Sequence, residues 1–160
     1  MHQVKETHQD LKTRSEAHYK TIGSVFCPAL KENVHFTSEG FNHLQYKKGG
    51  LRIESEQRLK MKLIPLGKDI IGKTTTIQEY RKGIVRIGKP RTDGFSKTSL
   101  AQYWGFSHVF IDGNTRVRAV VRRVGNGQLH FWSVMPTWYA IKNVGAAPIR
   151  SFGASDLEDA

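Results

Sequence analysis

The stretch that decides the fold is residues 103–135, which read YWGFSHVFIDGNTRVRAVVRRVGNGQLHFWSVM. It contains three runs rich in aromatic and β-branched residues. They are separated by Asp-Gly-Asn at 112–114 and Gly-Asn-Gly at 125–127. Such turn residues between β-rich runs are typical of hairpins. The sequence therefore predicts an antiparallel meander.

The middle and last runs of this meander carry side chains suited to a phosphodiester. The middle run has four arginines, among them Arg118 and Arg122, and the last run has His130, Trp132 and Ser133. Guanidinium groups bind phosphate oxygens, an imidazole titrates near neutral pH, and an indole can stack on an unpaired base. RNA cleavage without a metal needs a base for the 2′-hydroxyl, an acid for the leaving oxygen and cations for the developing charge.

The length of the Gly-Asn-Gly turn decides which of these side chains share a face. A three-residue loop pairs Arg122 with His130, gathers Arg118, Arg122, His130 and Trp132 on one face, and turns Ser133 toward the core. A two-residue loop exchanges the faces and brings Arg122 beside Ser133. We adopt the three-residue loop because it separates apolar from polar side chains more cleanly.

Length and composition bound the class of protein. A chain of 160 residues with 38% hydrophobic content supports one modest core. The single cysteine, Cys27, cannot form an internal disulfide. Asp69, Asp93 and Asp112 fall at a predicted helix end and in turns, which is unlike the carboxylate cluster of a metal-dependent nuclease. We therefore expect neither a metal nor another cofactor.

The charge of the chain favours a polyanionic partner. The formal net charge is +11, and residues 31–150 alone hold 21 Lys and Arg against 8 Asp and Glu. Such an excess on a small domain favours nucleic acid, because neutralised phosphates release counterions. No compact polybasic helix and no long apolar run points to a membrane. The alternative is a surface charge that only keeps the protein in solution.

The rest of the sequence predicts an α+β fold in which N-terminal helices pack on a small antiparallel sheet of about four strands. Residues 1–22 form a polar helical arm, residues 23–143 a single domain, and residues 144–160 a flexible tail with an acidic end. Helices are expected near residues 40–47 and from about residue 54, the second interrupted at Pro65. Residues 83–87 form an edge strand, and residues 88–99 form a basic loop.

His43 is the best candidate for a second proton-transfer group if its helix packs at the edge of the sheet. Lys47, four residues later, would be its neighbour on the helix. Either histidine, His43 or His130, could instead be a structural side chain, and basic residues on helices often lie on a solvated face. The candidates for nucleic-acid binding are Lys47, Lys48, Arg58, Arg81, Arg122 and Trp132.

Helices followed by a basic meander that ends in His130-Phe131-Trp132-Ser133-Val134 resemble the barnase, EndoU, colicin and RelE-like (BECR) group of small nucleases. The resemblance covers roughly residues 34–138 and is closest to phage-associated members and to toxins of toxin–antitoxin pairs. It implies a metal-independent endoribonuclease whose catalytic residue types are matched here by His43, Arg118 and Ser133, with His130 as an additional candidate. It also implies an acidic antitoxin or immunity protein as a partner.

The sequence thus predicts a cytoplasmic endoribonuclease that cleaves RNA through attack of the 2′-hydroxyl, without membrane association. The catalytic candidates are His43, Arg118, His130 and Ser133. The alternative is a non-catalytic module that binds RNA or DNA through the same basic sheet. In the adopted register Ser133 faces away from Arg118 and His130, so the register and the role of Ser133 cannot both hold.

Overall fold

A computed structural model of the protein describes residues 5–110, 116–137 and 157. The elements of these residues, in chain order, are α1 (His8–Ile22), β1 (Ser24–Cys27), β2 (Glu32–His35), α2 (Ser38–Gln45), β3 (Tyr46–Lys47), β4 (Gly50–Leu51), α3 (Glu54–Lys62), α4 (Ile64–Lys73), β5 (Glu79–Ile87), β6 (Lys97–Val109), β7 (Arg116–Val124) and β8 (His130–Pro136). The predicted α+β class, with helices first and a meander after them, is confirmed.

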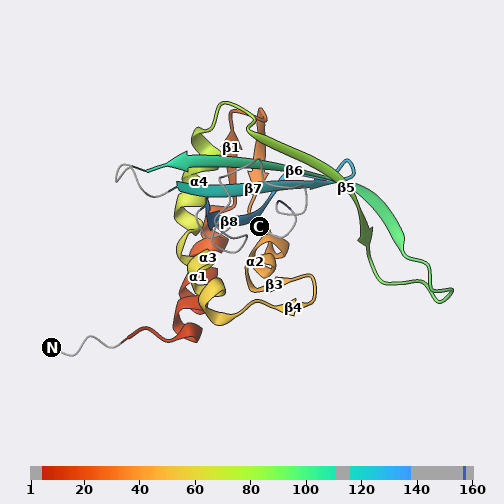
Figure 1. Ribbon diagram of the computed structural model, residues 1–160, viewed down its shortest axis with the longest axis horizontal. Coiled ribbons are helices and arrows are strands. Elements are labelled where there is room, and N and C mark those ends of the chain that lie inside the picture. The colour runs from red at the N-terminus through yellow and green to blue at the C-terminus, as the bar shows by residue number, and fades with distance from the viewer. Residues whose placement is uncertain (1–4, 111–115, 138–156, 158–160) are drawn as a thin grey trace, which may run out of the picture.

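The main sheet has six strands in the order β1-β2-β8-β7-β6-β5, where about four antiparallel strands were predicted. Neighbouring strands are antiparallel except β2 and β8, which run parallel and pair at His35 and His130. Strands β3 and β4 form a separate small hairpin. Figure 1 shows the helices gathered at one side of the sheet, whereas the β5–β6 hairpin projects from the other side.

The main core lies between the helices and one face of the sheet. Leu11 and Tyr19 of α1, spaced for one helical face, are both buried in it, so the predicted polar arm is docked on the domain. Its position is fixed further by a hydrogen bond from the Tyr19 hydroxyl to the Thr37 carbonyl, 2.7 Å long. The other face of the sheet carries a smaller cluster that includes Leu157, a described residue of the predicted tail.

Helix α2 lies unusually close to strand β8. A Cβ atom at Gly40 would come within 2.2 Å of the Phe131 carbonyl oxygen, so only glycine allows this approach. Helix α2 ends at Gln45, which places Lys47 and Lys48 in the small hairpin and its turn instead of on a helix. Helices α3 and α4 meet at Leu63, with Pro65 in the first turn of α4, as the sequence predicted.

The register of β7 and β8 confirms the predicted pairing of Arg122 with His130. Beyond it the ladder has a β-bulge: Val121 pairs with Phe131, and Val120 pairs with Ser133. The bulge shifts every later residue of β8 by one position, so Met135 pairs with Arg118. The prediction that Ser133 turns toward the main core is therefore wrong: it lies opposite Val120, which belongs, like Met135, to the smaller cluster on the other face.

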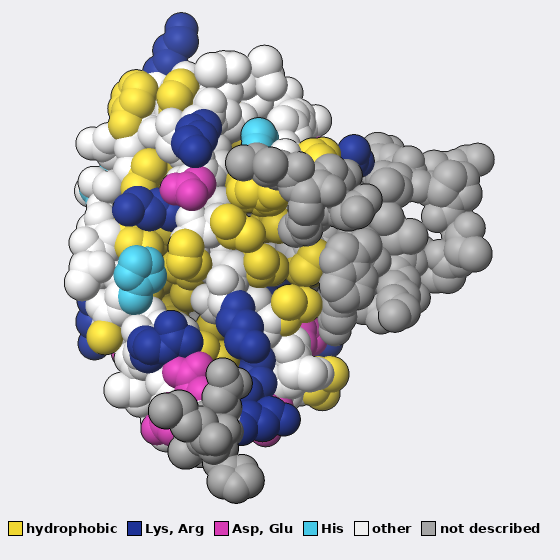
Figure 2. Space-filling view, turned by 90° about the vertical axis from the view of Figure 1, so that its left-hand side faces the viewer, with side chains coloured by type: hydrophobic (Ala, Val, Ile, Leu, Met, Phe, Trp, Pro, Cys, Tyr) yellow, Lys and Arg dark blue, Asp and Glu magenta, His cyan; other side chains and the backbone are white. Residues whose placement is uncertain are grey.

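The predicted loop at residues 88–99 is shorter than expected, because β6 already begins at Lys97. The predicted edge strand, residues 83–87, is the end of the nine-residue strand β5. On the side of the molecule opposite this hairpin, Lys and Arg side chains are interspersed with hydrophobic and acidic ones (Figure 2). None of the helices in the described part of the chain has the length and apolar character that spanning a membrane requires.

Candidate nucleic-acid site

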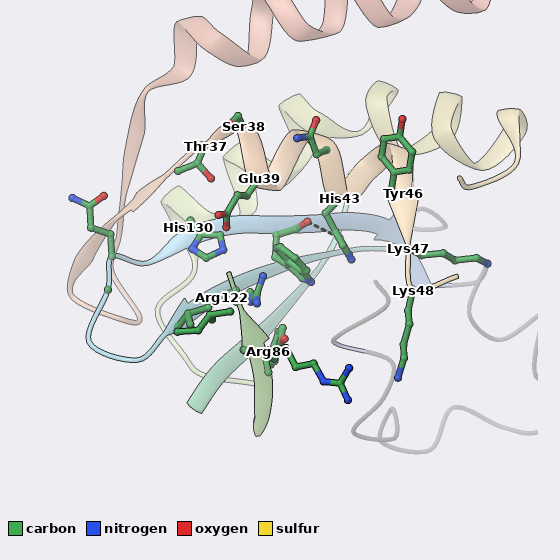
Figure 3. A pocket seen from close by; sticks show the side chains of 18 of the residues that line it. Thr37, Ser38, Glu39, His43, Tyr46, Lys47, Lys48, Arg86, Arg122 and His130 are labelled. Atoms are coloured by element: carbon green, nitrogen blue, oxygen red, sulfur yellow. Dashed lines mark hydrogen bonds between the residues drawn. The ribbon is translucent and has the colours of Figure 1, made fainter. Parts of the chain in front are cut away.

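A cavity of about 1300 Å³ opens between α2, the β3–β4 hairpin and the second face of the sheet. Six of the ten residues predicted for catalysis or binding line this cavity: His43, Lys47, Lys48, Arg122, His130 and Trp132. Glu39 and Arg86, which were not among the predicted residues, also line it. Figure 3 shows Glu39, His130 and Arg122 close together on one side, with Lys47 and Lys48 on the other.

Two buried nitrogen atoms in this cavity have no hydrogen-bond partner among the described residues: Nε of Arg122 and Nε2 of His130. These residues are directly opposite each other on β7 and β8. Leaving such groups desolvated and unpaired is costly. An anion whose oxygen reaches Arg122 would satisfy this unpaired donor with a charge-assisted contact, so this point of the cavity is suited to a phosphate.

His130 is held as a neutral base. Burial lowers the pKa of its imidazole, and the neighbouring Arg122 guanidinium lowers it further, while a hydrogen bond to the Gln128 backbone and the Glu39 carboxylate act in the opposite direction. Bonding to the backbone carbonyl of Gln128 uses one ring N–H. The unpaired Nε2 then presents its lone pair to the cavity. A lone pair in this position can accept a proton.

Trp132 is largely covered by protein groups. The His43 imidazole stacks on it with ring centroids 3.9 Å apart, and the guanidinium carbon of Arg122 lies 4.0 Å from the ring centroid. Stacking of a base on this indole would have to displace one of them. We therefore assign Trp132 to holding Arg122 in place by a cation–π contact.

His43 has both ring nitrogens engaged. Its Nδ1 donates to the Trp132 carbonyl at 3.0 Å, and its Nε2 faces a guanidinium nitrogen of Arg52 at 3.4 Å. Burial, and next the charge of Arg52, lower the pKa of His43 to about 3. The imidazole therefore stays neutral near pH 7 and fastens α2 to the bulged part of β8. This environment assigns it a structural role instead of the predicted proton transfer.

The pH dependence of stability tests this assignment. The pKa of His43 is about 3 in the folded protein against an ordinary value of 6.5. Its contribution to the free energy of unfolding is therefore fully present above pH 6.5 and is lost as the pH falls toward 3. Between pH 7 and pH 5 this group removes about 2 kcal/mol of unfolding free energy. The amide of a His43→Asn variant can still donate a hydrogen bond to the Trp132 carbonyl but does not titrate. Between pH 7 and pH 5, this variant should therefore lose about 2 kcal/mol less unfolding free energy than the native protein, as measured by urea denaturation. An unchanged loss would contradict the assignment.

The remaining predicted residues lie elsewhere. Arg118 is 1% exposed and contacts Glu79 at 3.3 Å and the Met135 sulfur at 3.3 Å. Ser133 is fully buried, and its hydroxyl accepts a hydrogen bond from the Lys60 ammonium at 2.9 Å. Neither residue lines the cavity.

Arg58 and Arg81 do not line the cavity either. Arg58 bonds Glu54 and the Glu6 carbonyl, which ties α3 to the segment before α1. Arg81 lies half-buried on β5 opposite Tyr103. Two sequence signals point to the residues that were not selected: Glu39 precedes His43 by one helical turn, and Arg86 alternates with apolar residues along an edge strand.

The described residues contain no group of three His, Cys, Asp or Glu side chains that could hold a metal ion. Comparison of the chain with protein-family models, curated proteins and solved structures finds no match.

Proposed function

We propose that the cavity binds single-stranded RNA and cleaves it by attack of a 2′-hydroxyl on the adjacent phosphate. The observation that carries the proposal is the pair of unpaired nitrogens, Arg122 Nε and His130 Nε2, inside a basic cavity. An RNA phosphate placed there would have a guanidinium on its oxygens and an imidazole lone pair within reach of the neighbouring hydroxyl.

In the proposed reaction His130 Nε2 takes the proton of the 2′-hydroxyl as the new bond from the 2′-oxygen to phosphorus forms. Arg122 stabilises the negative charge that develops on the phosphoryl oxygens. The bond from phosphorus to the 5′-oxygen then breaks, and that oxygen takes up a proton from solvent in the open cavity. The products carry a 2′,3′-cyclic phosphate and a 5′-hydroxyl. The Glu39 carboxylate, which faces His130 (Figure 3), favours the imidazolium that forms.

A non-catalytic binding module is the second candidate, and the position of the other predicted catalytic groups favours it. Arg118 and Ser133 are buried away from the cavity, and His43 is held neutral by its contacts. Only one predicted proton-transfer group, His130, therefore remains at the site. Such a module would bind RNA and release it intact.

Cleavage assays with two matched oligonucleotides separate the candidates. We expect the protein to cleave single-stranded RNA in EDTA, and to bind but not cleave an RNA of the same sequence with 2′-O-methyl groups, which cannot supply the nucleophile. Binding of both strands without cleavage would favour the binding module. Cleavage of the methylated strand would contradict attack by the 2′-hydroxyl.

A further inference from the structure

The end of the β5–β6 hairpin forms a two-stranded ribbon, residues 84–100, beside which the described residues place no third strand. Strand β7 pairs with β6 only as far as Ala101, whereas β5 and β6 pair onward to Ile87 and Lys97. Figure 1 shows the ribbon projecting from the body. At about 3.3 Å per residue, the four β5 residues from Ile84 to Ile87 extend roughly 13 Å before the loop that leads to β6.

The ribbon is basic and exposed. Its cations are Arg86, Lys89, Arg91 and Lys97, all exposed, against the single carboxylate Asp93. A ribbon of two strands has little core of its own, and its apolar side chains are correspondingly open: Ile84 is 70% exposed, and its cross-strand partner Leu100 is 43% exposed. This combination of cations and uncovered apolar surface indicates a binding surface for a polyanion.

The ribbon is continuous with the cavity. Ile84, Val85, Arg86, Ile87 and Gly88, at the beginning of the ribbon, form one wall of the cavity that holds His130 and Arg122. Lys89, Arg91 and Lys97 lie beyond this wall. A nucleic-acid strand bound in the cavity would therefore have its flanking nucleotides beside the ribbon.

The side chains of the ribbon suit a double helix better than a single strand. Single-stranded nucleic acid is held largely by aromatic rings on which successive bases stack. The face that carries Ile84 and Leu100 presents aliphatic groups, and Phe95 is the one exposed aromatic residue among residues 84–100. Duplex RNA is recognised by its shape and by phosphate and 2′-hydroxyl contacts across a wide, shallow minor groove, for which cations on both strands of a narrow ribbon are suited.

We propose that the ribbon binds an RNA stem next to the unpaired nucleotides held in the cavity, so that the preferred substrate is an RNA in which a single-stranded segment adjoins a duplex. This inference rests on the proposed function for the choice of RNA as the ligand of the cavity. The ribbon would give the RNA a second contact area. The affinity would then depend on the length and the secondary structure of the RNA.

The test compares two RNAs: a single strand of about six nucleotides, and the same six nucleotides joined to a stem of about ten base pairs. Both are bound to the full-length protein, with fluorescence anisotropy as the readout. The test variant carries Lys89→Gln, Arg91→Gln and Lys97→Gln, none of which lines the cavity. The control variant removes the same charge from exposed lysines of the helices through Lys20→Gln, Lys62→Gln and Lys73→Gln.

We expect the native protein and the control variant to bind the stem-containing RNA about ten-fold more tightly than the short strand. The ribbon variant should lose that advantage, and the logarithmic salt dependence of its stem binding should fall by about 0.7–0.9 per phosphate contact removed. Affinity for the short strand should be unchanged.

A stem that gives the native protein no advantage, or a ribbon variant that weakens both RNAs equally, would overturn the inference. Because binding is the readout, the outcome does not depend on cleavage. Stem-dependent binding without cleavage would contradict the proposed function alone, and cleavage with equal affinity for both RNAs would contradict the ribbon alone.

Discussion

Replacing His130 by alanine should lower the rate of RNA cleavage by about one hundred- to ten-thousand-fold, the usual contribution of a positioned general base. The imidazole presents an unpaired Nε2 to the cavity opposite Arg122, and no other predicted proton-transfer group is free there. Affinity for a 2′-O-methyl RNA should change much less, because Arg122, Arg86 and the lysines that line the cavity remain.

His35 provides a matched control. It is the partner of His130 across the parallel pairing of β2 and β8, but it does not line the cavity. His35→Ala should leave the rate within a few-fold of the native value, and thermal unfolding should show that both variants are folded. Equal losses in the two variants would indicate a change in the sheet instead of a lost base.

The pH profile of RNA cleavage by the native protein offers a second readout of the same role. A base must be unprotonated, and burial lowers the pKa of His130 below its ordinary value. The value of kcat/KM should therefore be constant near neutral pH and fall on the acid side, with an apparent pKa below that of a free histidine. A rate that instead rose as the pH fell below 6 would assign His130 the role of an acid.

Replacing Glu56 by alanine should destabilise the protein by about 3–5 kcal/mol. The side chains of Arg52 and Glu56 are 1% and 10% exposed, and their oxygen and nitrogen atoms lie 2.8 Å apart. Without the carboxylate, the guanidinium of Arg52 stays charged and buried next to Lys60. The pKa of Lys60 is already lowered by burial and by the charge of Arg52.

Glu54 is the matched control for Glu56, two residues away on the same helix. It also pairs with an arginine, Arg58, but its side chain is 63% exposed. Glu54→Ala should cost only a few tenths of a kcal/mol, because exposed pairs are screened by water. Urea denaturation of both variants measures the difference in unfolding free energy. Losses of similar size would contradict the claim that the buried Arg52–Glu56 pair stabilises the protein.

Turn chemistry and alternation were enough to predict the meander, and the pairing of Arg122 with His130 followed from the Gly-Asn-Gly loop. The bulge in β8 could not be predicted from alternation, and it coincides with tertiary contacts of Trp132: its ring stacks on His43, and its carbonyl accepts a hydrogen bond from His43. Strand β1 was not predicted, because four residues are too few to show a clear period.

The candidate site was predicted unevenly for a physical reason. Residue type indicates which side chains can do chemistry, but burial and neighbours decide which of them do. Arg118 and Arg122 lie on one face of one strand, yet the first is buried against Glu79 and Met135, whereas the second lines the cavity. His43 lies at the cavity, but its burial and the charge of Arg52, which lies between β4 and α3, keep it neutral.

The chemical identity of the new RNA ends distinguishes attack by the 2′-hydroxyl from other routes of cleavage. Single-stranded RNA is incubated with the native protein in EDTA at pH 7, and the fragments are analysed by mass spectrometry. The proposed attack by the 2′-hydroxyl predicts fragments that end in a 2′,3′-cyclic phosphate and begin with a 5′-hydroxyl. RNA that stays intact, or fragments with a 3′-hydroxyl and a 5′-phosphate, would contradict the role assigned to His130 and Arg122.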